Sequence, residues 1–542
     1  MNSKQQILLN KIEYLLKFFY IIGFLVVLAM LSEVGKDYII SSFMVFMLIY
    51  LFCGLSLPQA FSNLVKSRFQ KQQLGSARTI FFSTLLYSSI LEGVAMLVAF
   101  CFVNKMSAFL HTSKALPFGI ALFLPLLFLI PVNEVFRCYY QYYNRRLTVI
   151  VSRALGFFTT LVVGLCIYKP LKEYGQKVDA LLKSDCMADL YASLTIPISL
   201  LAAQVLVCLV LLWMYLVYKP YMNKQIGHDL GRNKENVFSM LPIVAKAHVS
   251  ANLHKISIYL LVLLAFVFCS FYNRRMLGTE EMNTSFGILA VVFGVTVLIP
   301  YFVTRAFSLK YVYRYRKMLK NEDMRSVKAY LWGRTHKYFI IAVALTIFFM
   351  VMSKSVIFIL TGTTAKQYII HMQILSLAFV LVPLYSLYNM FLSNIGKTKS
   401  LLIINYISLF ASAIIMGILY NISAIGGYGI SIGVIFYFLI AFICEFFVLE
   451  RESGFNRNIM QLLVLPAVCA MVMGIILLLL NKAIGIASNR FVELLILLGL
   501  LVLCVVIYMV LLLVLRCVDE DELNGGFWGK IIYRLGELLH IY

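Results

Sequence analysis

The chain has 542 residues, of which 62% are hydrophobic and 13% are charged, and its mean hydropathy is +0.90. These values exclude an ordinary soluble globular protein and indicate an integral membrane protein. The formal net charge of +23 does not require a nucleic-acid partner, because excess Lys and Arg in a membrane chain concentrates in cytoplasmic loops. We therefore expect no nucleic acid to bind.

Reactive motifs are missing from the sequence. The 11 cysteines have no paired or metal-binding spacing, and most lie in apolar runs where they act as small hydrophobic residues. The histidines have no metal spacing either. We find no nucleophile elbow, paired-carboxylate motif, HExxH or phosphate-binding glycine loop. The sequence therefore predicts no metal, no cofactor, no catalytic residue and no enzyme activity.

Apolar runs long enough to cross about 30 Å of hydrocarbon need about 20 residues of helix. The chain contains fourteen such runs, centred near residues 24, 47, 91, 125, 157, 205, 258, 295, 349, 380, 410, 437, 471 and 503. The fourth run contains Pro117, Pro125 and Pro131, and the seventh begins with polar residues, so their boundaries are the least certain. The pattern predicts an all-α membrane protein with about 14 transmembrane helices.

Basic residues alternate between the loops in a way that defines an orientation. With the N-terminus inside, most of the 47 Lys and Arg fall in inner segments. The inner segment 305–337 holds ten basic residues, whereas the outer loop 169–190 holds four lysines and four acids. Since short cytoplasmic loops are rich in Lys and Arg, we expect both termini to be cytoplasmic.

Two patterns recur along the chain. "GLSLPQAF" (54–61), a basic stretch and a span are followed later by "GVTVLIPYF" (294–302), a second basic stretch and a span. Likewise "YYQYYNRRLTVIVSRALGFF" (139–158) parallels "YNMFLSNIGKTKSLLIINYISLF" (388–410). Transporters are often built from such repeats. We expect two six-helix lobes. The N-lobe contains helices 1–6 (1–218), the C-lobe contains helices 7–12 (237–450), and a cytoplasmic linker (219–236) joins them. Helices 13 and 14 (451–516) and a cytoplasmic tail (517–542) follow.

Several segments between residues 10 and 515 carry a family resemblance, and one of them begins at Arg137. "RCYYQ" (137–141), followed by "LTVIVSRALGFF", resembles the Arg-Gly-Tyr-Phe-Gln-Gly element of polysaccharide flippases. These belong to the branch of stage V sporulation protein B and lipid II flippases in the multidrug/oligosaccharidyl-lipid/polysaccharide exporter superfamily. The chain departs from that element at Cys138 and Tyr142, where glycines are expected. Its first helix offers only Lys11 and Lys17 in place of cavity arginines.

The resemblance implies a flippase that moves a lipid-linked oligosaccharide from the inner to the outer leaflet by alternating access. The cargo would be a polysaccharide repeat unit or a peptidoglycan-type precursor. The implied partners are this lipid-linked glycan, membrane lipids and glycan-assembly proteins, and the implied location is the bacterial cell membrane. The last two helices would then form a groove for the lipid tail.

Two other functions stay open. A drug/cation antiporter of the same superfamily would need a carboxylate-centred cavity. A multi-span glycan polymerase or ligase would need reactive basic residues in a large outer loop, and here the basic residues are mostly inside.

The seventh span contains "AKAHVSANLHK" (245–255). At helical spacing Lys246 and His254 share one polar stripe, and Asn252 and Lys255 share another. Because Lys255 lies about 16 Å along the span, it is close to the midplane. Cations there would offset the cost of moving a diphosphate through hydrocarbon.

Residues on other spans complete the candidate set. Arg153 and Arg305 are cavity candidates as well, although both lie near inner span ends, where snorkelling to lipid headgroups is the alternative. Glu92 on the third span is the candidate ion-coupling residue, and its pairing with Lys255 is the alternative. Three other charged residues could form gating pairs or be plain interface residues, and we favour the second interpretation: Lys354 in the outer half of its span, and Glu134 and Glu445 toward the inner ends of theirs.

Overall fold

The computed structural model describes residues 3–109, 116–183, 186–227, 236–275, 286–320, 324–422, 425–453, 464–487, 489–515 and 517. Every regular element within these ranges is a helix. This is the expected result for segments in hydrocarbon, because a helix satisfies its own backbone hydrogen bonds. The all-α prediction is confirmed.

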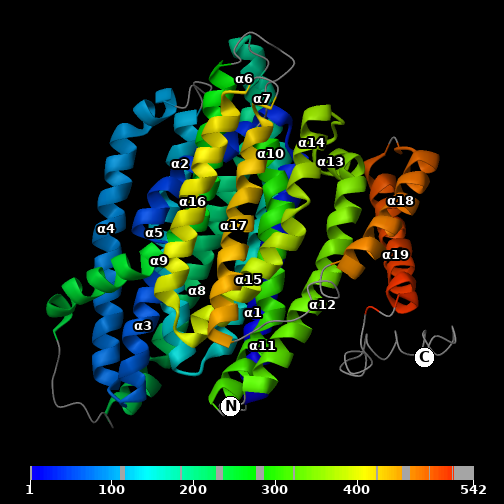
Figure 1. Cartoon of the computed structure of the whole chain (residues 1–542). Helices are drawn as coiled ribbons and strands as arrows, with labels where there is room; N and C mark the ends of the chain where they lie inside the picture. The colour runs from blue at the N-terminus through cyan, green and yellow to red at the C-terminus, as the bar shows by residue number, and fades with distance from the viewer. Residues whose placement is uncertain are drawn as a thin grey trace. The chain divides into compact units, whose positions relative to one another are not determined.

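The chain divides into two compact units. The first comprises residues 1–274 and 285–290, and the second comprises 275–284 and 291–542. Figure 1 colours the first unit from blue to green. Its helices are α1 (Ser3–Met30), α2 (Glu33–Cys53), α3 (Leu57–Gln70), α4 (Leu74–Phe109), α5 (Leu116–Tyr142), α6 (Arg146–Leu182), α7 (Met187–Ser193), α8 (Thr195–Ile226) and α9 (Val237–Arg275).

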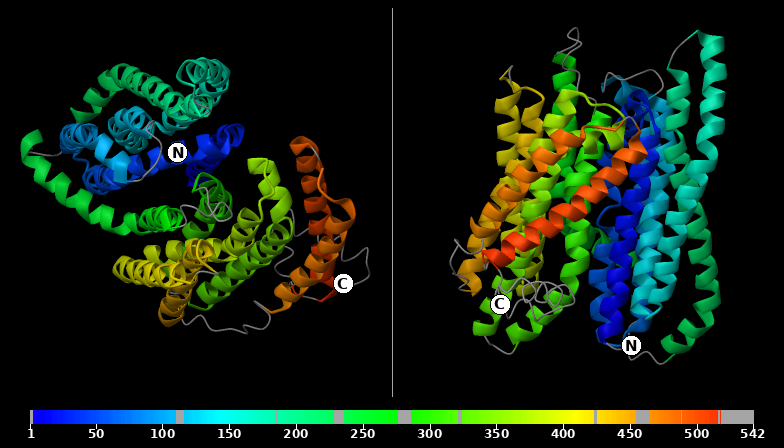
Figure 2. Two further views of the ribbon diagram at one scale, coloured as in Figure 1. Left: turned by 90° about the horizontal axis from the view of Figure 1, so that it is seen from above. Right: turned by 90° about the vertical axis from the view of Figure 1, so that its right-hand side faces the viewer.

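A short helix, α10 (Phe286–Phe293), leads into the second unit through a π-helical turn at Gly294–Leu298. The remaining helices are α11 (Ile299–Lys320), α12 (Met324–Val351), α13 (Ser353–Thr361), α14 (Lys366–Leu375), α15 (Ala378–Ile395), α16 (Thr398–Tyr420), α17 (Tyr428–Ser453), α18 (Leu465–Ile484) and α19 (Arg490–Val514). The last two helices pack against each other as a hairpin, which is orange to red in Figure 2.

The described helices match the predicted spans. Twelve are long and apolar enough to cross a membrane, and α9, bent by 59° between its halves Val237–Leu253 and Ile256–Tyr272, makes thirteen. The shorter apolar stretch Leu15–Met30 accounts for the remaining predicted span. Pro125 and Pro131 lie inside α5 without ending it. The chain is thus a multi-pass membrane protein.

The tyrosines of "RCYYQYYNRR" lie in the core of the first unit. The ring of Tyr139 stacks on Phe81 with 4.1 Å between centroids, and the Tyr140 hydroxyl donates to the Leu211 carbonyl at 2.8 Å. Both tyrosines are fully buried. They anchor the C-terminal part of α5 against α4 and α8.

The two parallel sequence stretches form the same turn. Asn144, between α5 and α6, has φ 58°, and Gly396, between α15 and α16, has φ 91°. This left-handed backbone suits Gly and is tolerated by Asn. The next residue in each turn donates its N–H five residues back, Arg145 to Tyr140 at 2.9 Å and Lys397 to Leu392 at 3.1 Å. The shared geometry supports the predicted repeat, whereas the lobe boundary at 219–236 stays a prediction.

Candidate functional site

Charged side chains from α1, α5 and α6 form a network inside the first unit. The Arg153 guanidinium donates to both oxygens of Glu134 at 3.0 and 2.8 Å, and its Nε donates to Glu13 at 3.1 Å. Arg137 Nη1 donates to Glu134 at 2.6 Å. Lys17 lies 3.7 Å from Glu13. Among the described side chains, this network holds three cations and two carboxylates, which leaves one positive charge in excess.

The backbone geometry of α5 and α6 brings this network together. Glu134 and Arg137 are three residues apart and so share one face of α5. Arg137 also reaches α6, where Nε donates to the Ser152 hydroxyl at 3.0 Å. Its side chain is 6% exposed, and that of Arg153 is 13% exposed. Charges this far from water need close partners, and each arginine has them.

Arg153 differs from the other cations in how its partners are supported. It is held by Glu134 and Glu13, but Glu134 is also paired with Arg137, and Glu13 with Lys17. The Glu13 carboxylate accepts a further hydrogen bond from Gln141 at 3.2 Å. Removal of Arg153 from the network would leave both carboxylates paired. Arg153 is thus the cation that both carboxylates share.

A second polar cluster of the first unit surrounds Glu92 on α4. Ser88 donates to Glu92 Oε2 at 2.6 Å. Tyr87, on the preceding turn, contacts His248 Nδ1 of α9 at 3.3 Å. The His248 carbonyl accepts from Ser56 at 3.2 Å. Glu92 and His248 are both almost fully buried.

Several polar atoms on α4 and α9 have no hydrogen-bond partner within the described part of the chain. They are Glu92 Oε1, His248 Nε2 and Asn252 Oδ1. Buried polar groups are normally paired. A proton, a small cation or water would satisfy a carboxylate oxygen such as Glu92 Oε1.

The predicted site residues fall in different places. Arg153 belongs to the charged network and Glu92 to the second cluster. Asn252 is half-buried and Lys246 is exposed on α9. His254 and Lys255 lie outside the described side chains, so their cavity role stays a prediction, as does the expected Lys255–Glu92 pair.

Arg305 lies on α11 in the second unit. Its guanidinium lies 4.7 Å from the ring centroid of Tyr301, a favourable cation–π distance, and it lies within electrostatic range of Glu445. The Glu445 carboxylate accepts from Asn389 at 3.0 Å and is fully buried. Its role as a plain interface residue is wrong, because α15 and α17 enclose it.

Glu134 is not enclosed in this way, since its side chain is 23% exposed, but it pairs with Arg137 and Arg153 and so is not a plain interface residue. The sequence did not predict these partners. The three-residue spacing of Glu134 and Arg137 could have predicted that they share one face of a helix. Nothing in the sequence indicated that Glu13 on α1 would reach Arg153 on α6. That contact depends on how α1 packs against α6.

The residues at equivalent positions near the two turns differ in charge. Asn389 precedes Gly396 by the same seven residues as Arg137 precedes Asn144, and Asn405 follows Gly396 by the same nine residues as Arg153 follows Asn144. Asn405 accepts from the Tyr385 hydroxyl at 3.2 Å. Both equivalent positions are therefore polar and hydrogen-bonded, but only the first unit carries cations there.

Comparison with known proteins identifies the fold. A scan against protein-family models finds no match, and a search of curated proteins finds no relative. Among solved structures, the lipid II flippase MurJ in an inward closed conformation is similar with a TM-score of 0.60 and 12% identity, over 93% of this chain and 98% of MurJ.

Two transporter structures are similar as well. A MATE structure in a bent conformation gives a TM-score of 0.57 at 14% identity, over 84% of this chain and 96% of its own. An inward-facing multidrug resistance MATE family transporter of the MOP superfamily gives 0.58 at 13% identity, over 81% of this chain and 94% of its own. The chain therefore has the fold of these membrane transporters, as its sequence resemblance predicted.

We predict that Glu134→Gln destabilises the protein. The change leaves the buried Arg137 without its carboxylate partner and Arg153 with Glu13 alone, and breaking a buried pair in this way costs about 3–5 kcal/mol. Thermal unfolding of the purified protein measures the effect. The matched control is Glu452→Gln, which removes the half-exposed pair of Glu452 with Lys397 and should cost no more than about 1 kcal/mol. Equal melting temperatures for the two variants would contradict the prediction.

Proposed function

We propose that this protein is a flippase that moves a lipid-linked oligosaccharide from the inner to the outer leaflet by alternating access. The cargo is a polysaccharide repeat unit or a peptidoglycan-type precursor, and the protein carries out no covalent chemistry. The fold shared with a lipid II flippase and with multidrug transporters supports a transport role. The excess positive charge around Arg153 is the observation that favours an anionic cargo.

A lipid-linked sugar carries a diphosphate, which must cross a region where a lone charge costs at least about 2.5–3.5 kcal/mol. An arginine offsets that cost best, because its planar guanidinium binds phosphate oxygens in pairs. Arg153 already holds a carboxylate in this two-bond geometry. In the proposed mechanism a phosphate takes the place of Glu134 at Arg153, while Glu134 keeps Arg137 and Glu13 keeps Lys17.

We predict that Arg153→Gln slows flipping at least about tenfold, because a charged hydrogen bond contributes about 1.5–3 kcal/mol. Initial rates are measured in proteoliposomes with a fluorescent lipid-linked oligosaccharide, at equal amounts of reconstituted protein. Arg153→Lys should restore part of the rate, since it keeps the charge and loses the paired geometry.

The melting temperatures of the variants serve as the control for this experiment. Arg153→Gln should lower the melting temperature less than Glu134→Gln, because both carboxylates retain a cation. An unchanged flipping rate in folded Arg153→Gln protein would reject Arg153 as a cargo-binding residue.

The cluster around Glu92 favours a second function, cation-coupled antiport. A buried carboxylate with one oxygen lacking a partner among the described residues suits a proton or a monovalent cation. In the flippase, by contrast, outward movement of negative charge runs down an inside-negative potential and gains about 2.3 kcal/mol per charge per 100 mV. That potential can drive flipping without an ion at Glu92.

We predict that an inside-negative K⁺ diffusion potential accelerates flipping and that the acceleration persists in Glu92→Gln. The assay uses proteoliposomes without a pH or Na⁺ gradient. The coupled mechanism would be favoured by the opposite pattern: flipping does not respond to potential, and it requires both Glu92 and a proton or Na⁺ gradient.

The proposed direction of transport requires a defined orientation in the bacterial plasma membrane. We propose that both termini and the basic segment 305–337 are cytoplasmic, because this arrangement places most Lys and Arg inside. A cysteine introduced by Lys320→Cys should react with a membrane-permeant maleimide in intact cells and stay unlabelled by an impermeant one. Labelling by the impermeant reagent would overturn the orientation.

A further inference from the structure

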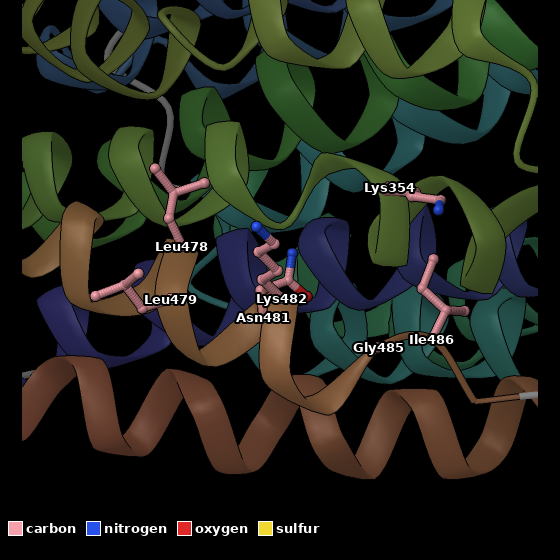
Figure 3. Close-up of a pocket in the computed structure, with 7 residues that line it drawn as sticks. All are labelled: Lys354, Leu478, Leu479, Asn481, Lys482, Gly485 and Ile486. Carbon is pink, nitrogen blue, oxygen red and sulfur yellow. The ribbon is translucent and has the colours of Figure 1, made fainter.

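A cavity of about 510 Å³ lies at the end of α18 in the second unit, where α13 begins. Its volume lies in the range of small-molecule sites. Figure 3 shows Lys354 of α13 on one wall and Lys482 beside Asn481 on the other. The remaining lining residues are Leu478, Leu479, Gly485 and Ile486. Among the described lining residues, two are positively charged and none is acidic.

The polar and apolar parts of this cavity lie at different depths. Lys482 is in the last turn of α18, and Leu478 is one turn earlier, about 6 Å deeper by the helical rise. Leu478 and Leu479 are 53% and 67% exposed, so they face the surroundings of the helix. The ammonium groups thus lie at the level where a span ends, and the apolar wall lies at the level where hydrocarbon begins.

We propose that this cavity binds the phosphodiester headgroup of an anionic phospholipid from the surrounding bilayer. The phosphate lies between Lys354 and Lys482, the Asn481 amide donates to it, and the acyl chains follow Leu478 and Leu479. A zwitterionic lipid binds less well, because its cationic group meets two lysines and no carboxylate. A headgroup of one phosphate and one glycerol suits the cavity better than the larger oligosaccharide of the proposed cargo.

The bound lipid also bridges α13 and α18, which supply the two lysines. A ligand that binds only the folded state raises its stability. Phosphatidylglycerol is therefore expected to raise the melting temperature of the full chain more than phosphatidylcholine does.

The test compares full-length protein in detergent with equal amounts of phosphatidylglycerol and phosphatidylcholine, using native mass spectrometry to measure the retained lipid. Each lysine near a membrane surface contributes about 1 kcal/mol to anionic lipid binding. The double variant Lys354→Gln/Lys482→Gln should therefore bind phosphatidylglycerol at least about tenfold more weakly and lose its thermal stabilisation by this lipid.

The matched control is Lys177→Gln/Lys366→Gln, which removes the same charge from exposed positions outside the cavity. It should bind phosphatidylglycerol like the unsubstituted protein. Equal losses in both double variants, or equal retention of the two lipids by the unsubstituted protein, would overturn the proposal. Displacement of phosphatidylglycerol by substoichiometric polyprenyl diphosphate would also overturn it, because the cargo would then occupy the cavity.

Discussion

The Glu134 carboxylate pairs with two guanidinium groups inside the first unit, and the packing of α1, α5 and α6 depends on this charge balance. Arg137 and Arg153 lie close together, so without an acid between them they would repel each other across a medium that screens poorly. The carboxylate lets two helices carry cations on facing surfaces. Glu13 then joins α1 to the same centre through Arg153.

The two arginines of this centre have different sets of partners. Arg137 donates to Glu134 and also joins α5 to α6 through Ser152. Arg153 is the shared member, and each of its carboxylates has a second cation. The ion pairs of Glu134 and Glu13 stabilise the unit, and Arg153 takes part in both.

The two equivalent turns share their backbone geometry but differ in the charge of the residues near them. Asn144 and Gly396 occupy equivalent left-handed turns, so the two units use the same backbone conformation to join neighbouring helices. Near those turns the first unit has arginines where the second has asparagines, which hydrogen-bond without adding charge. The fold similarity to known transporters at 12–14% identity is consistent with this distinction. Apolar length and turn geometry define the helices, and a few polar residues define the charge near each turn.

Much of the fold follows from the sequence alone, because hydrocarbon imposes a simple rule. A run of about twenty apolar residues must form a helix that satisfies its own backbone, so composition and spacing were enough to locate the predicted spans, the prolines within α5 included. The charged network around Glu134 could be predicted only in part from the sequence. Helical spacing placed Arg137 and Glu134 on one face, but the approach of Glu13 to Arg153 joins α1 to α6. Only tertiary packing decides which helices meet and whether a charge near a span end turns outward to the headgroups or inward to a partner.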